Sequence, residues 1–229
     1  MQELKVIARI YTDFPEKFGL PRQSGVVKGL MGKVVFEPRY RDFSAVRELS
    51  EFSHIWLVWG FSLSHKKEWS PTVRPPRLGG NERVGVFATR SPYRPNPIAL
   101  SALKLERVAD EKDLGPVLYV SGIDMVNGTP IYDIKPYIAY TDSVTDAVCG
   151  FADKPYNSSL RVLLPETVDD CPLGKEKLSQ LCETLKCDPR PRYHNDSERV
   201  YGLTFSNCDV KFKVSAGILT VLSINKIKE

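Results

Sequence analysis

The 229-residue chain is predicted to be a mainly β protein, with a small N-terminal β-barrel followed by a small α+β C-terminal domain. Two observations predict this. Short runs of β-branched and aromatic residues recur through the first two thirds of the chain, separated by turn residues, and an amphipathic helical pattern stands out only in the last third. Many short strands with few helices are typical of a barrel or a sandwich.

The first strand is expected over Leu4–Tyr11, because apolar residues alternate along it. One helix should follow it, capped by Asp42 or Ser44, because apolar residues recur at helical spacing from Val46 to Phe52. Further strands are expected over the remaining β-rich runs of this part: Val34–Phe36, Ile55–Phe61, Val84–Ala88, Leu103–Val108, Val117–Ser121 and Ile131–Tyr140.

The last third predicts a β-α-β-β-β unit. A strand over Leu160–Leu164 precedes a helix over Pro172–Leu185, in which leucines share one face. The three strands that follow are Val200–Phe205, Val210–Val214 and Ile218–Ile224. Because residues 142–158 are polar and poor in strand formers, we expect a barrel domain over 1–145 and a second domain over 158–229.

The positive charge is concentrated in one stretch. The chain has 32 Lys and Arg against 28 Asp and Glu, a net charge of +4. Residues 66–94 alone hold seven Lys and Arg against two Glu, and five of the seven are Arg, whose planar fork suits phosphate and carboxylate. This pattern indicates an anionic partner such as nucleic acid, although a solvated charged loop would show the same pattern.

Several classes of protein are excluded by missing motifs. The chain has no glycine fingerprint of a dinucleotide site, no P-loop, no nucleophile elbow and no H-E-x-x-H. Its five cysteines are an odd number and form no Cys-x-x-Cys, so neither a disulfide framework nor a metal site is expected. There is no signal-peptide layout, and no apolar run approaches the ~18 residues of a membrane span, which predicts a cytoplasmic protein.

Four loops hold more Pro, Arg and Gly than a connection needs: residues 19–23, 69–81, 85–98 and 127–137. Proline restricts the backbone and lowers the entropy lost when a loop is ordered. Such loops are suited to presenting Arg, Asn and Thr to a ligand, although they would also serve as rigid turns.

Within these loops, residues 90–98 read Arg-Ser-Pro-Tyr-Arg-Pro-Asn-Pro-Ile, which resembles the signature of the TsaA-like (TrmO) family. The similarity extends to four further segments: Pro21–Gln23, Ser70–Asn81, Gly128–Tyr137 and Asp188–Tyr193. It therefore covers most of the chain, including the second domain.

The resemblance implies a β-barrel methyltransferase without a Rossmann fold, working as a homodimer with its donor, S-adenosylmethionine, near the subunit interface. The implied substrate is threonine tRNA, methylated on N6 of the threonylcarbamoylated adenine 37 in the anticodon loop. The implied donor-binding residues are Pro21, Arg22, Gln23, His65, Lys66, Arg90, Leu100, Asn127, Gly128, Thr129 and Pro130. Three residues depart from the family pattern: Asn127 stands for Asp, Lys66 for Gln and Ala99 for Gly.

The chemistry of the donor predicts roles for some of these residues. Arg90 or Arg22 would pair with the donor carboxylate. Backbone groups at Leu100 and at Gly128-Thr129 would read the edge of its adenine. The N6 amine must lose a proton on methylation, and Asp133 is the predicted acceptor, unless it only forms an ion pair with a cation such as Lys135. Tyr137 would orient the base, or simply pack.

For the RNA, the predicted phosphate-binding residues are Arg74, Arg77, Arg83 and Arg94, joined in the second domain by Arg190, Arg192 and Tyr193. That second set would otherwise be a rigid proline-bounded turn. Tyr93 and Trp69 are predicted to stack on bases, or to pack within the protein. Two other functions remain open: methyl transfer from the same donor to another RNA or a small molecule, and RNA binding without catalysis.

Overall fold

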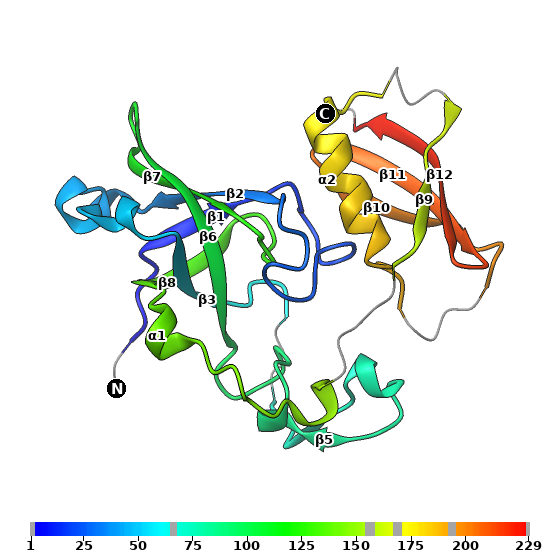
Figure 1. Ribbon diagram of the computed structural model, residues 1–229, viewed down its shortest axis with the longest axis horizontal. Coiled ribbons are helices and arrows are strands. Elements are labelled where there is room, and N and C mark those ends of the chain that lie inside the picture. The colour runs from blue at the N-terminus through cyan, green and yellow to red at the C-terminus, as the bar shows by residue number, and fades with distance from the viewer. Residues whose placement is uncertain (1–2, 65–67, 154–158, 167–170, 192–195, 228–229) are drawn as a thin grey trace.

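The computed structural model describes residues 3–64, 68–153, 159–166, 171–191 and 196–227. Its first part is a closed barrel of antiparallel strands, which confirms the predicted fold class (Figure 1). Around the barrel the strands follow the order β1 (Ala8–Tyr11), β2 (Met31–Phe36), β7 (Gly115–Ser121), β6 (Ile98–Glu111), β3 (His54–Gly60) and β8 (Thr129–Pro136).

The long strand β6 is what allows the barrel to close. Its first half pairs with β3 and its second half with β7, and a register shift lies between Leu105 and Arg107. Such a shift bends a strand and increases its twist. Inside the barrel, Gly32 meets the core closely, because a Cβ there would lie 2.8 Å from Ile123 Cγ2 and 2.9 Å from Ile10 Cδ1.

The predicted helix near residues 44–53 is wrong. Two short 3₁₀ turns stand there instead, η2 (Phe43–Val46) and η3 (Leu49–Glu51). Glu48 lies between them with φ +65°, a left-handed conformation that no α-helix can include. Of the two predicted caps, Asp42 caps η2, since its carboxylate accepts the Ser44 amide at 2.8 Å.

The strand predicted over Val84–Ala88 is also mostly wrong. Only β5 (Val84–Gly85) is extended, paired with β4 (Thr72–Val73), and a 3₁₀ turn η5 (Val86–Ala88) follows. The turn forms because the Thr89 amide bonds back to the Val86 carbonyl, which buries Val86 and exposes Phe87. The remaining 3₁₀ turns of the described chain are η1 (Pro38–Tyr40), η4 (Pro76–Leu78) and η6 (Gly150–Ala152).

Strand lengths differ from expectation at both ends of the barrel domain. β1 begins at Ala8 rather than Leu4, and β8 ends at Pro136 rather than Tyr140. Proline has no amide hydrogen to donate to a ladder, and the short helix α1 (Ala139–Asp142) starts three residues later.

The second domain confirms the predicted β-α-β-β-β unit. Its elements are β9 (Arg161–Leu163), α2 (Lys175–Lys186), β10 (Tyr201–Phe205), β11 (Cys208–Ser215) and β12 (Ile218–Lys226). The sheet has the order β10-β11-β12-β9, with β9 parallel to β12. Helix α2 lies across one face of this sheet (Figure 1). Alternate residues of β10 and β11 are buried, and Leu181 and Leu185 of α2 are fully buried.

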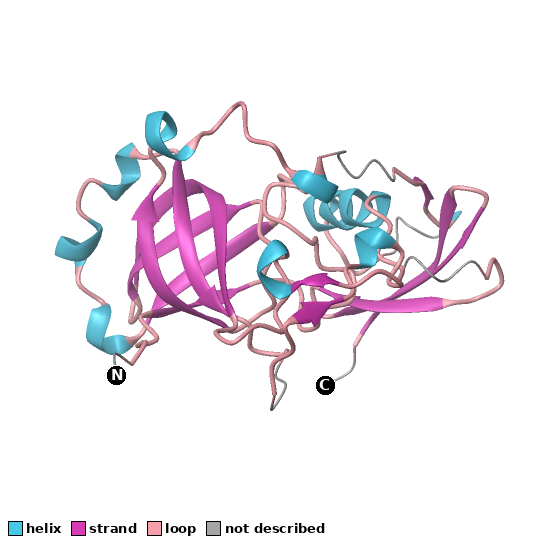
Figure 2. Cartoon of the chain, turned by 90° about the horizontal axis from the view of Figure 1, so that it is seen from below, coloured by secondary structure: helices cyan, strands magenta, loops and turns pink. Residues whose placement is uncertain are grey.

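The connection from β1 to β2, residues 12–30, packs against the second domain and is called here the β1–β2 loop. Phe14 meets Phe205 edge-on at 5.2 Å, and Phe18 stacks on Tyr201 and Phe212, each at 6.4 Å between ring centroids. One buried apolar cluster therefore runs through both domains. Figure 2 shows the barrel and the second domain side by side, with loops gathered between them.

Candidate active site

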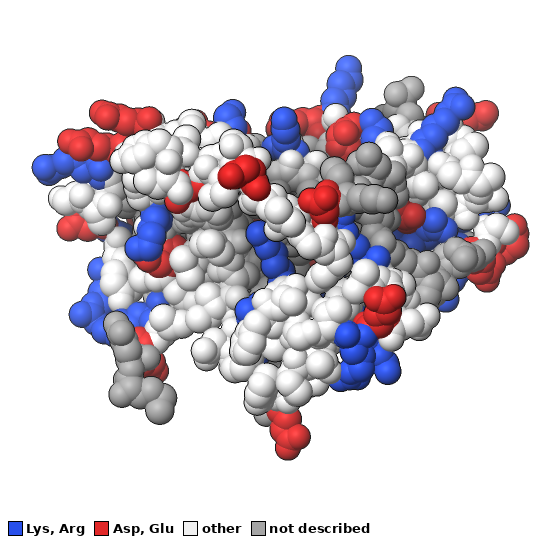
Figure 3. All heavy atoms as spheres, turned by 60° about the horizontal axis from the view of Figure 1, so that its bottom comes forward, with Lys and Arg blue, Asp and Glu red and all other residues white. Residues whose placement is uncertain are grey.

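A cavity of about 880 Å³ lies where the β1–β2 loop, the loop after β5 and the start of β6 meet. The β1–β2 loop supplies Pro21–Ser24, the second loop supplies Arg90 and Arg94, and the barrel supplies Trp59, Leu100 and Ser101, among other residues. On the face drawn in Figure 3, Lys and Arg side chains show in the hollow near the middle of the surface. The cavity thus joins three segments that are far apart in the sequence.

Six of the residues predicted to bind the donor line this cavity: Pro21, Arg22, Gln23, Arg90, Leu100 and Thr129. Three others, Asn127, Gly128 and Pro130, are not among its lining residues. His65 and Lys66 lie outside the described residues, although the preceding Ser64 lines the cavity. The structure therefore brings most of the predicted set together.

Two hydrogen-bond links hold the cavity walls to one another. Arg90 Nη1 donates to Gln23 Oε1 at 2.5 Å, which ties the loop after β5 to the β1–β2 loop. Lys17 Nζ donates to the Leu63 carbonyl at 2.6 Å and to Ser64 Oγ at 2.9 Å, which ties the β1–β2 loop to the segment after β3. The side chains best placed to meet an anionic ligand thus also fix the shape of the site.

The turn that contains Asn127 supports the cavity from behind. Asn127 Oδ1 accepts the Thr12 amide at 3.0 Å, and the Asn127 amide donates to the Phe14 carbonyl at 2.7 Å. Gly128 has φ +77°, a conformation that glycine adopts without strain. Because the side chain acts through an oxygen acceptor, asparagine makes this contact as an aspartate would. The departure from the family residue leaves the turn intact.

Ala99 lies inside β6, paired with Trp59, and its φ is not in the left-handed region. Alanine is therefore unstrained at the position where the family usually has glycine.

Asp133 and Tyr137 do not line the cavity. Asp133 forms an ion pair with Lys135 at 2.9 Å and is half exposed on β8. The Tyr137 ring packs on Trp56, 5.5 Å away, and on His54, 6.2 Å away. Since Trp56 lines the cavity, Tyr137 lies behind its wall. The catalytic roles predicted for both residues remain predictions.

Asp124, which the sequence analysis missed, is the only carboxylate among the described residues that line the cavity. Ser101 Oγ donates to Asp124 Oδ1 at 2.8 Å, and Trp59 Nε1 donates to Ser101 Oγ at 2.9 Å. Burial raises the pKa of Asp124 to about 6. The hydrogen bonds from Ser101 and the Ser24 amide and the charge of Arg90 act in the opposite direction, because they favour the ionised form. An acidic residue inside the apolar run from Ile123 to Val126 was the available sequence signal.

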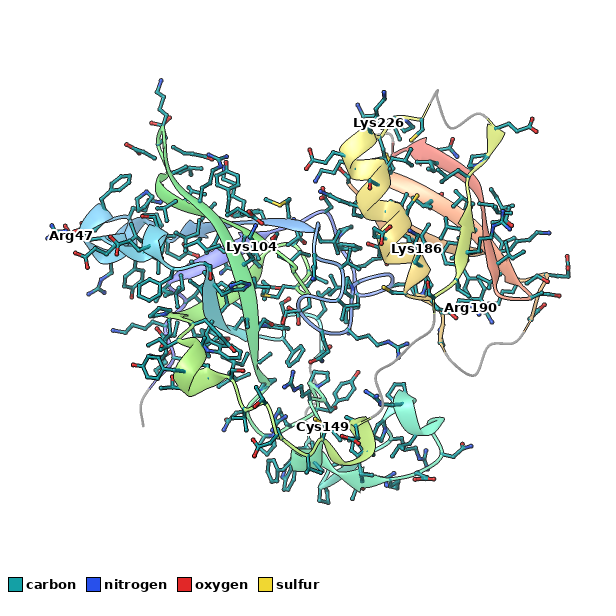
Figure 4. All side chains as sticks on the ribbon, viewed as in Figure 1. Arg47, Lys104, Cys149, Lys186, Arg190 and Lys226 are labelled. Carbon is teal, nitrogen blue, oxygen red and sulfur yellow. The ribbon has the colours of Figure 1, made fainter. Side chains whose placement is uncertain are left out.

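The residues predicted to bind RNA are spread over both domains. Arg94 lines the cavity, and Arg74 is exposed. Arg83 bonds to Thr72 Oγ1 at 2.8 Å, and Arg77 lies on η4. Arg190 forms a two-point ion pair with Asp188, both bonds at 2.9 Å, beyond the end of α2 (Figure 4). Arg192 and Tyr193 lie outside the described residues.

Beside the cavity, two aromatic rings are stacked in the open. Trp69 and Phe87 are 54% and 71% exposed, with ring centroids 6.4 Å apart. The Arg94 guanidinium lies 5.9 Å from the Phe87 ring, and both side chains line the cavity. Phe87 was missed in the sequence because it falls within the incorrectly predicted strand. Tyr93 is 37% exposed on the same loop.

All five cysteines are free thiols. Among the described residues, no cluster of three or more His, Cys, Asp or Glu is arranged to hold a metal ion. No helix in the described ranges is long and apolar enough to cross a membrane.

Comparisons with known proteins match this architecture in both domains. The model of the tRNA-methyltransferase O (TrmO) N-terminal domain matches residues 9–143, and that of the TrmO C-terminal domain matches residues 163–227. The chain is 39% identical over 220 residues to the tRNA (adenine(37)-N6)-methyltransferase of Escherichia coli, covering 93% of each. It is 34% identical over 223 residues to a putative S-adenosylmethionine-dependent methyltransferase, RcsF, of Pseudomonas aeruginosa, covering 89% of each. A crystal structure of TrmO from Pseudomonas aeruginosa superposes with a TM-score of 0.78 at 30% identity, covering 99% of this chain and 97% of the other.

Proposed function

Because the chain belongs to the TrmO family, we propose that it is a tRNA (adenine(37)-N6)-methyltransferase with S-adenosylmethionine as methyl donor. One observation supports this most directly. The single cavity described above gathers residues of three distant segments that the family resemblance assigns to donor binding. The cavity lies at the mouth of a barrel, a common place for a small-molecule site.

The chemistry of the cavity fits the donor. The donor's carboxylate would pair with Arg22 or Arg90, and its adenosine would lie against the apolar wall of Trp59 and Leu100. When bound, S-adenosylmethionine supplies an electrophilic methyl group. The protein's part is to hold acceptor and donor in line, and loops fixed by the Arg90–Gln23 bond are suited to that task.

We further propose that the acceptor is the threonylcarbamoylated adenine 37 of threonine tRNA. The threonyl group brings a second carboxylate into the site. Among the described residues, four cationic side chains line the cavity, Lys17, Arg22, Arg90 and Arg94, enough to neutralise two carboxylates at once.

The anticodon loop would bind across the surface around the cavity. Base-modifying enzymes take their target out of the stack, and exposed aromatic side chains can take the neighbouring bases. The exposed Trp69–Phe87 pair, of which Phe87 lines the cavity, would stack on such bases. Arg74, Arg77, Arg83 and Arg94 would meet phosphates near the cavity, and Arg190, Arg192 and Tyr193 would do so from the second domain.

We also propose a cytoplasmic homodimer. The segment that leads from the barrel to the second domain exposes large apolar side chains, including Tyr140 and Val148, which are 88% and 90% exposed. A second copy of the chain would cover them. Sedimentation equilibrium tests this, and a monomer at micromolar concentration would contradict it.

The function is tested with purified protein and tRNA from a strain that lacks the gene. Labelled methyl from S-adenosylmethionine should appear in N6-methylated threonylcarbamoyladenosine, and tRNA that lacks the threonylcarbamoyl group should not be labelled. Label in other RNA or in small molecules only would favour the alternative acceptor. If calorimetry detects no binding of S-adenosylmethionine, the result would favour an RNA-binding protein without catalytic activity.

Arg90→Ala tests the donor site within the same assay. We expect donor affinity to fall by about 10- to 100-fold, since a charge-assisted bond is lost. The matched control is Arg47→Ala, an exposed arginine at the end of the barrel domain far from the second domain (Figure 4). Unchanged donor affinity in Arg90→Ala would remove Arg90 from the donor site.

A further inference from the structure

We propose that Asp124 accepts the proton that leaves N6 of the target adenine, and that Ser101 and Trp59 position its carboxylate for this step. The inference rests on the proposed methyltransferase function and assigns to it a proton acceptor other than Asp133. It follows from where the chain places its acidic groups relative to the cavity.

Asp124 lines the cavity in which the methyl transfer would take place. Transfer of the methyl group needs a proton acceptor within hydrogen-bond reach of the nitrogen. Asp124 is the only carboxylate among the described lining residues, and the charged groups around it are cationic: Lys17, Arg22, Arg90 and Arg94. Asp133 does not line the cavity and already has a cationic partner in Lys135.

Hydrogen bonds hold the Asp124 carboxylate in place. Trp59 Nε1 donates to Ser101 Oγ, and Ser101 Oγ donates to Asp124 Oδ1, so a buried indole orients the serine hydroxyl toward the acid. The Ser24 amide also donates to Asp124, which connects the carboxylate to the loop that carries Pro21–Gln23. An acid held from two walls is kept at one place in the cavity.

The pKa of the Asp124 carboxyl also suits a proton acceptor. A base is most effective when its pKa lies near the working pH, and burial moves the pKa of Asp124 to about 6. The group is thus mainly ionised at neutral pH, yet binds a proton far better than an exposed aspartate does.

The step balances in atoms and charge. The N6 lone pair forms the new bond to the methyl carbon as the carbon–sulfur bond breaks, and the electrons of that bond stay on sulfur. The N6–H proton passes to Asp124. The sulfonium and the carboxylate are charged before the step, and thioether and carboxylic acid are neutral after it.

The test is single-turnover methyl transfer to modified threonine tRNA between pH 5 and pH 9. In the wild type we expect the rate to rise through a midpoint near 6 and to level off above it. Asp124→Asn should lower the rate about 10²- to 10⁴-fold and abolish this pH dependence, with donor binding retained in calorimetry. Ser101→Ala should shift the midpoint upward, because a hydrogen bond that favours the ionised acid is lost.

The matched control is Glu106→Gln. Glu106 lies on β6, as Ser101 does, and its carboxylate accepts the Ser121 hydroxyl at 2.5 Å. Because Glu106 does not line the cavity, the pH profile of the rate in Glu106→Gln should follow that of the wild type. Infrared difference spectra provide a readout besides activity. A carboxylic acid band that titrates near pH 6 in the wild type should be missing in Asp124→Asn.

Each result decides the inference. If Asp124→Asn keeps the rate and the pH profile of the wild type, the inference is overturned. It is also overturned if Asp133→Asn loses the rate and Asp124→Asn does not. A titrating band that persists in Asp124→Asn would assign that pKa to another group and overturn it too. If the wild type itself transfers no methyl to tRNA, the proposed function fails first, and the inference fails with it.

Discussion

Asp124 links the chemistry of the cavity to the stability of the fold. Its pKa is about 6 in the folded chain and about 3.9 when unfolded, so the folded state binds the proton more tightly. The group therefore contributes stability below pH 4, and this contribution is lost as the pH rises through 6. At neutral pH the buried charge destabilises the wild type.

Asp124→Asn should remove this pH dependence. We expect the variant to exceed the wild type by about 1–3 kcal/mol in free energy of unfolding at pH 8, and to approach it near pH 4. Urea titrations at a series of pH values measure the difference. Glu106→Gln should behave in the opposite way, because hydrogen bonds from Ser121 and Lys104 lower the pKa of Glu106. Parallel curves for wild type and Asp124→Asn would contradict the prediction.

Asn127 gives a second prediction for a single residue. Asn127→Ala loses the bond to the Thr12 amide and should cost about 1 kcal/mol of stability, whereas Asn127→Asp keeps an oxygen acceptor and should cost little. Thermal unfolding of the two variants checks this. Equal destabilisation by both would show that the amide group, not the acceptor, matters.

The orientation of single side chains was the hardest feature to predict from the sequence. The family resemblance pointed to Arg90 and Gln23, which line the cavity, but which side of a segment faces a cavity depends on register and on distant partners. Asp124 was missed for that reason, because its apolar neighbours Ile123 and Met125 indicate burial without showing that the acid points into a site. Asn127 was expected to touch the donor; its side chain accepts the Thr12 amide and does not line the cavity, and the donor contact stays a prediction.

At the scale of elements, the β1–β2 loop is the part on which the site depends most. Its first half is fastened to the second domain through Phe14 and Phe18, and its next residues form one wall of the cavity. The ion pair of Asp13 with Lys177 on α2 adds to this attachment. Donor binding should therefore respond to residues that never touch the donor.

Phe18→Ala tests this dependence. Removing the ring should cost about 2–3 kcal/mol of stability and weaken donor binding, because Leu20–Ser24 lose their support. Calorimetry at a temperature where the variant is folded measures the affinity. The control is Phe43→Ala, an exposed phenylalanine on η2. Unchanged affinity in Phe18→Ala would show that the barrel alone holds the loop.

Strands were easier to predict than helices, for a physical reason. Alternation of apolar residues reports burial of one sheet face, and this signal is local, so the barrel strands and the β-α-β-β-β unit were recognised. The helix expected near Val46 failed because its spacing was also compatible with two 3₁₀ turns joined at a left-handed Glu48. Val84–Ala88 failed because pairing with Thr72–Val73 ends after two residues.

At the scale of the whole molecule, charge and exposed aromatic rings are gathered around one cavity, although the chain's net charge is only +4. The second domain contributes less, since Arg190 is neutralised by Asp188. RNA affinity should therefore depend mainly on the barrel domain.

Arg74→Ala should weaken tRNA binding and reduce the slope of log affinity against log salt by about 0.7, the value for one phosphate contact on a single strand. Donor affinity should stay unchanged, because Arg74 is exposed and does not line the cavity. Filter binding at several salt concentrations measures the slope. An unchanged slope would place the tRNA elsewhere on the molecule.

The attachment of the β1–β2 loop also has a consequence for the order of synthesis. Phe14 and Phe18 are synthesised more than 190 residues before their partners Phe205 and Phe212. During that interval the barrel strands can pair, but one wall of the cavity lacks its support. A nascent barrel would therefore bind donor poorly, and the site would become competent only after Phe205 and Phe212 have been synthesised.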